Sequence, residues 1–153
     1  MTEPLHNVAG EPLPEGVDLL GLGVRALAFS VALGAAAITA VIWAVQSILP
    51  SAPAGAPSGA PATGAPFYLL VLGTPAAMGL AAVACWILLR PVQSWFRRGA
   101  LAMVSGFLSL VVSLLTLPAN AIFGRAGLAA ATVLFAAAAL LGARSLQRWS
   151  RAT

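Results

Sequence analysis

Residues 22–49 read LGVRALAFSVALGAAAITAVIWAVQSIL, and this stretch contains a single charged side chain, Arg25. A helix of about 20 apolar residues crosses the roughly 30 Å hydrocarbon core of a lipid bilayer. The stretch is therefore long enough to span a membrane with some tilt. Arg25 lies near its first end, where a long side chain can extend its charge to the lipid headgroups. Pro50 ends the run because proline cannot continue a helix.

Three further apolar runs follow, at residues 67–89, 100–117 and 126–143. Across the whole chain 60% of residues are hydrophobic and 8% are charged, whereas about a quarter of the residues in a soluble domain are charged. A soluble fold of 153 residues could not cover its surface with so few polar groups. The sequence therefore predicts an all-α membrane protein, with four transmembrane helices in an up-down bundle.

Two segments outside the spans have distinctive compositions. Residues 1–21 hold all four acidic side chains and three prolines. They lack the basic start and early apolar region of a secretory signal, so we expect an uncleaved N-terminal tail in the cytoplasm. Residues 50–66, PSAPAGAPSGAPATGAP, repeat Gly-Ala-Pro without a charge. Proline this frequent favours extended chain over helix, which predicts an external linker that serves as a spacer or, alternatively, is recognised by a partner.

The remaining connections are short. Residues 90–99, RPVQSWFRRG, combine three arginines with two aromatic side chains, which is typical of a segment at a lipid headgroup surface. We expect them to form a basic interfacial loop in the cytoplasm. Residues 118–125 are expected to make an external turn, and residues 144–153 a basic cytoplasmic tail.

The distribution of arginines predicts the orientation of the bundle. Basic residues that flank transmembrane helices accumulate on the cytoplasmic side. If both termini are cytoplasmic, Arg125 alone lies outside and all the other arginines lie inside. These inner arginines are also our candidates for topology determinants and headgroup contacts: Arg25, Arg90, Arg97, Arg98, Arg144, Arg148 and Arg151.

The basic residues also indicate the type of organism and membrane, and the class of partner. All eight basic residues are arginine, and alanine is abundant, a composition found in GC-rich bacterial genomes. We therefore expect a multi-pass protein of the bacterial cytoplasmic (inner) membrane. The net charge of +4 does not predict a nucleic-acid partner, because the arginines sit at the ends of apolar runs rather than on one basic face.

The sequence offers almost none of the residues that catalysis requires. His6 is the only histidine and lies in the N-terminal tail, Cys85 is the only cysteine, and lysine is absent. Catalytic triads, paired carboxylates, metal-ligand sets and lysine-containing phosphate loops all need residues that the spans lack. The sequence thus predicts a protein that is not an enzyme and that holds no cofactor or metal.

Small residues at four-residue spacing are the clearest pattern inside the spans. Such lines let membrane helices approach closely. One line lies in the second span and a line of serines lies in the third, and both are helix-packing candidates: Gly73, Ala77, Ala81 and Cys85, then Ser105, Ser109 and Ser113. We interpret Cys85 as a small buried residue. The serine hydroxyls are expected to bond the carbonyl one turn back, while inter-helix hydrogen bonds or a polar pathway are the alternatives.

Three functions are open, and the weakest of them is a membrane enzyme, because the spans lack acid–base residues. The other two fit these patterns better. The first is an accessory or structural subunit that packs against other membrane helices in a larger bacterial assembly. Its partners would be membrane lipids and other transmembrane subunits, or further copies of itself. The second is a small oligomeric transporter or channel, with a hydroxyl-lined path built from the serine line with Thr39, Thr74 and Thr116. Because no ionisable residue lies deep in any span, the transporter hypothesis is the weaker one.

Overall fold

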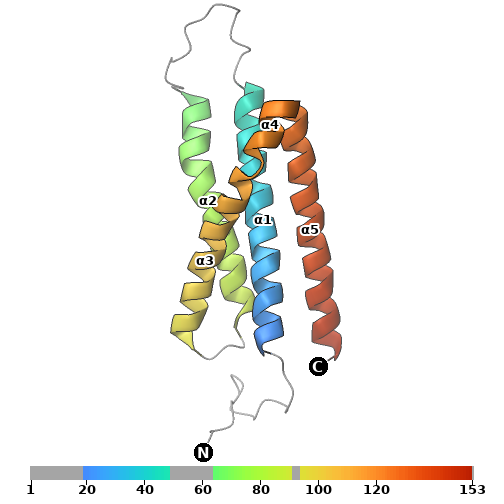
Figure 1. The fold of residues 1–153 in the computed structure, drawn as a ribbon. Coiled ribbons are helices and arrows are strands. Elements are labelled where there is room, and N and C mark those ends of the chain that lie inside the picture. Colours follow the sequence, from blue (N-terminus) through green and yellow to red (C-terminus); the bar gives the residue numbers. More distant parts are fainter. Residues whose placement is uncertain (1–18, 49–63, 91–93, 153) are drawn as a thin grey trace, which may run out of the picture.

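The computed structural model describes residues 19–48, 64–90 and 94–152, which form five helices. In chain order these are α1 (Leu19–Ile48), α2 (Ala65–Leu88), α3 (Trp95–Leu114), α4 (Leu117–Phe123) and α5 (Arg125–Ala152) (Figure 1). Four stretches are long and apolar enough to span a membrane: α1, α2, α3 together with α4, and α5. The all-helical architecture with four potential spans agrees with the sequence prediction and indicates a multi-pass membrane protein.

Successive long helices run in opposite directions, so that α1 begins and α5 ends at the same end of the bundle (Figure 1). Helix α1 is the central element, because α2, α3 and α5 all pack along it. Helices α2 and α3 also pack on each other, whereas α5 is supported mainly by α1 and, near its start, by α4. The bundle therefore consists of a three-helix unit, α1–α2–α3, with α5 attached on the far side of α1.

Local signals set the helix ends. The Ser94 side chain accepts a hydrogen bond from the backbone N–H of Arg97, at 3.4 Å, and so caps the start of α3. Helix α2 carries a proline in its first turn, where the missing N–H costs nothing. Gly124 has a φ of 56°, a non-helical conformation that separates α4 from α5.

The observed helices extend beyond the expected spans. Helix α1 begins three residues before the expected position 22, and α2 begins two residues before the expected position 67. Helix α3 includes residues 95–99, which the sequence placed in a loop, and α4 occupies most of the expected turn at 118–125. Helix α5 continues through the expected tail to Ala152. Apolar composition locates the part of a helix that can lie in hydrocarbon, while backbone hydrogen bonding continues into the polar interface. Residues 1–18 of the expected tail and residues 50–63 of the expected 50–66 linker lie outside the described residues.

The interior of the three-helix unit is built from small side chains. Gly34 of α1 lies where all three helices meet: a Cβ atom added there would be 2.7 Å from the Cβ of Ala81 on α2 and 2.8 Å from that of Ser109 on α3. Gly106 is similarly close to α2, since an added Cβ would be 3.0 Å from the carbonyl oxygen of Met78. The helix backbones thus approach closely because these positions lack bulk.

Large apolar side chains face outward. Met103 is 78% exposed, Phe107 63% and Leu134 69%. A soluble domain would bury such residues, whereas a bundle in lipid gains nothing by doing so. The arrangement of small residues inside and large apolar residues outside matches the solvent that the composition predicts.

Replacing Gly34 with alanine should destabilise the bundle by about 1–3 kcal/mol, because the added methyl group overlaps Ala81 and Ser109. Gly79→Ala is the matched control, since an added Cβ at Gly79 has nothing within 4 Å. That control should be neutral or gain up to about 1 kcal/mol from helix propensity. Unfolding by sodium dodecyl sulfate in mixed micelles, followed by circular dichroism, measures both. Equal midpoints for the two variants would contradict the assigned packing.

Candidate functional site

The small-residue lines of α2 and α3 lie inside the three-helix unit. Ala81, Cys85, Ser105 and Ser109 are fully buried, and Ala77 and Ser113 are nearly so. Gly73 is half-buried against Val41 of α1, whose Cγ1 would be 2.9 Å from an added Cβ. We call this set of seven predicted positions the small-residue seam. Because the seam packs α2 and α3 within one chain, it is covered by the chain itself.

The seam hydroxyls are bound to backbone carbonyls. Ser109 and Ser113 donate to the carbonyls of Ser105 and Ser109, four residues back, each at 2.7 Å. Ser105 donates to the carbonyl of Ala102 at 2.8 Å and also lies 3.3 Å from the carbonyl of Ala81 on α2. The interpretation that serines bond one turn back is confirmed for Ser109 and Ser113, and Ser105 adds an inter-helix contact. The serine line is therefore made of satisfied hydroxyls in a close-packed interior.

Cys85 lies in a buried cluster together with Ala26, Leu89 and Ala102. The hydroxyls of Ser30 and Ser105 lie beside its thiol. Among the described residues there is no group of three or more His, Cys, Asp or Glu side chains that could hold a metal ion. Cys85 thus has apolar and hydroxyl neighbours and no acid–base partner within this part of the chain.

A second polar contact joins α5 to α1. The hydroxyl of Thr132 lies 3.1 Å from that of Thr39 and 2.8 Å from the carbonyl of Leu128. Thr39 in turn donates to the carbonyl of Ala35 at 2.8 Å. Sequence reasoning singled out Thr39 as part of a possible path but missed Thr132, because one threonine in an apolar run gives no signal. The remaining path candidates are Thr116, which is buried and bound to the carbonyl of Ser113, and Thr74, which is half-buried.

The arginines gather at one end of the bundle. Helices α1 and α3 begin there and α2 and α5 end there (Figure 1), so the fold brings together residues far apart in the sequence: Arg25, Arg90, Arg97, Arg98, Arg144 and Arg148. All of them are exposed except Arg98, which is half-buried. Arg151 lies in the last turn of α5, outside the described side chains, and Arg125 starts α5 at the opposite end. Since every acidic residue of the chain lies within residues 1–18, the described part contains no carboxylate side chain near these arginines.

Arg98 has a specific environment within this end. Its guanidinium carbon lies 4.6 Å from the centroid of the Trp86 ring, and its Nη2 donates to the Trp86 carbonyl at 3.2 Å. Trp95 meets Trp86 edge to face, with centroids 6.0 Å apart. The Nε of Arg98 is buried without a hydrogen-bond partner among the described residues. The cluster ties the start of α3 to the end of α2, a structural role beyond the headgroup contact predicted for Arg98.

Replacing Arg98 with glutamine should lower stability by about 1–2 kcal/mol, because the substitution removes a partly desolvated cation–π contact and the hydrogen bond to Trp86. Arg144→Gln, an exposed arginine at the same end, should change stability by less than about 0.5 kcal/mol. Detergent unfolding gives the midpoints, and near-ultraviolet circular dichroism reports the Trp86–Trp95 pair. Similar losses in the two variants would mean that charge number, rather than stacking, sets the effect.

Comparison with known proteins finds no family model, no curated protein and no solved structure that matches this chain.

Proposed function

We propose that this chain is a non-catalytic accessory or structural subunit of a larger assembly in the bacterial cytoplasmic (inner) membrane. In this role it packs against other transmembrane helices or against copies of itself. The observation that carries the proposal is the outer face of α5, which remains uncovered although it has the features of a helix-packing surface.

The outer face of α5 combines small and branched apolar residues in helical register. It consists of residues that are all exposed and that lie opposite the side packed on α1: Ala126, Ala130, Val133, Leu134, Ala137, Leu140 and Leu141. The three alanines are spaced by four and seven residues, so they form one line along the helix. Small residues in such a line allow a second helix to approach closely. Only 17% of the most apolar part of α5 is buried within the chain, the same share as in α2 and less than the 39% of α1.

The seam supports packing over transport. Each seam hydroxyl is bound to a carbonyl, and the space at Gly34 is too small for a single methyl group. A hydroxyl-lined path would need these groups to face water-sized space.

Site-specific cross-linking tests the proposed interface. A photoreactive phenylalanine analogue is placed at Ala137, with Leu72 of α2 as the control because it is 66% exposed on a different helix. After irradiation of native membranes, we expect position 137 to cross-link to another membrane protein that also co-purifies in constant ratio after gentle solubilisation. The proposal would be contradicted if the protein purified without any other protein bound and formed no protein adduct from position 137.

We further propose that both termini lie in the cytoplasm, since the arginine-rich end of the bundle contains the start of α1 and the end of α5. Ser58→Cys labelling with a membrane-impermeant maleimide on intact cells measures this orientation. Position 58 should react from outside, while the parent protein, whose one cysteine is fully buried Cys85, should not. Reaction at position 58 only after the cells are opened would reverse the orientation.

A further inference from the structure

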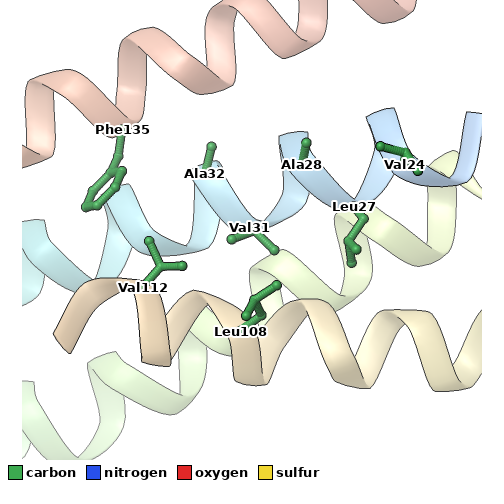
Figure 2. A pocket seen from close by; sticks show the side chains of 8 residues that line it. All are labelled: Val24, Leu27, Ala28, Val31, Ala32, Leu108, Val112 and Phe135. Carbon is green, nitrogen blue, oxygen red and sulfur yellow. The ribbon is translucent and has the colours of Figure 1, made fainter. Parts of the chain in front are cut away.

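A groove of about 320 Å³ lies on the α5 side of the three-helix unit (Figure 2). Helices α3 and α5 each pack along α1 but have little contact with each other, so α1 forms the floor of the groove. Its lining consists of eight apolar side chains, five from α1, two from α3 and one from α5: Val24, Leu27, Ala28, Val31, Ala32, Leu108, Val112 and Phe135. The volume falls at the lower end of the range, about 300–1,000 Å³, that small ligands occupy in proteins.

The length of the groove matches one leaflet. Its lining on α1 extends from Val24 to Ala32, which corresponds to about 12 Å at 1.5 Å per residue. One leaflet contributes about 15 Å of hydrocarbon. A partner transmembrane helix would run along the full 30 Å or so of the core, whereas an acyl chain is confined to one leaflet. The apolar lining offers no partner for a polar group, and Ala28 and Ala32 provide the space.

Positive charge lies at the mouth of the groove. Arg25 follows Val24 directly, at the end of the bundle where α3 also begins. Arg97 precedes Leu108 by eleven residues, about three helical turns, and therefore lies on the groove side of α3. Both arginines are exposed, and the described residues contain no carboxylate side chain to neutralise them. An arginine binds phosphate through paired N–H donors.

We propose that this groove binds one acyl chain of an anionic phospholipid, with the headgroup phosphate held by Arg25 and Arg97. The lipid comes from the leaflet at the end of the bundle where α1 begins. The acyl chain fills the space between α3 and α5, and the two arginines select a lipid with net negative charge. This site differs from the outer face of α5, because Phe135 and that face point to different sides of the helix.

Native mass spectrometry of the full-length protein tests the site. The protein is released from mixed micelles that contain equal amounts of phosphatidylglycerol and phosphatidylcholine with identical acyl chains. We expect one retained lipid per protein molecule, with phosphatidylglycerol favoured about fivefold or more, since a basic residue near an anionic headgroup contributes about fivefold in binding. Retention of the two lipids in equal amounts by the parent protein would overturn the proposal.

Two sets of variants separate the acyl-chain contact from the charge contact. Ala32→Leu and Ala28→Leu fill the groove, and each should reduce retained lipid at least fivefold, while Ala76→Leu on the exposed side of α2 leaves it unchanged. Arg25→Gln combined with Arg97→Gln should keep a bound lipid but abolish the preference for phosphatidylglycerol. Arg144→Gln is the control for that pair, because Arg144 lies nine residues, about two and a half helical turns, after Phe135 and so on the opposite side of α5.

Circular dichroism in the same micelles confirms that each variant is folded, and having two groove-filling variants guards against the misfolding of one. If both folded leucine variants retain lipid like the parent, the groove is not the site. A folded parent protein that retains no lipid would also overturn the proposal. Neither result depends on whether another protein binds the outer face of α5.

Discussion

The close approach of three helices at Gly34 is the constraint on which the rest of the structure depends. In lipid, helices gain little from burying apolar surface, because the acyl chains are as apolar as the side chains. Association therefore depends on how closely the backbones can pack. At Gly34 the Cβ atoms of Ala81 and Ser109 leave no space for a methyl group, so α2 and α3 hold their positions on α1 by shape. The inter-helix contact from Ser105 to the carbonyl of Ala81 adds one polar interaction at the same level.

This constraint determines which residues are available for other roles. The seam takes one line of small residues from each of α2 and α3 into the interior, and large apolar side chains such as Phe107 lie on the outer surface. The serine hydroxyls are used in the same way, since each is bound to a carbonyl of the seam. Features that resemble a polar path in sequence thus become packing elements in the folded chain, and the surfaces that remain are suited to lipid and to other helices.

Helix α5 is attached differently, and this accounts for both proposed surfaces. It packs along α1 with Gly142 against Phe29 and with a hydroxyl contact between Thr132 and Thr39, and it makes little contact with α3. The side of α5 that faces away from α1 carries a line of alanines. On the side that faces α3, the gap between the helices leaves an apolar groove with Arg25 and Arg97 at its mouth. A helix held on one side only therefore creates two faces of different shape, one suited to a partner helix and one to an acyl chain.

The sequence by itself determined the solvent, the number of potential spans and the candidates for close packing, because apolar length and small-residue spacing are local properties of a helix. It placed Ala81, Cys85 and Ser109 on packing lines without knowledge of the neighbours. It could not show that these lines face one another, nor that Gly34 is the point where they meet, because those facts depend on the register between helices. The pairing of Thr39 with Thr132, the stacking of Arg98 on Trp86 and the groove between α3 and α5 each join residues from separate helices. Only the tertiary structure decided them, since the relative rotation and height of packed helices are set by contacts across the bundle and not by any one stretch of chain.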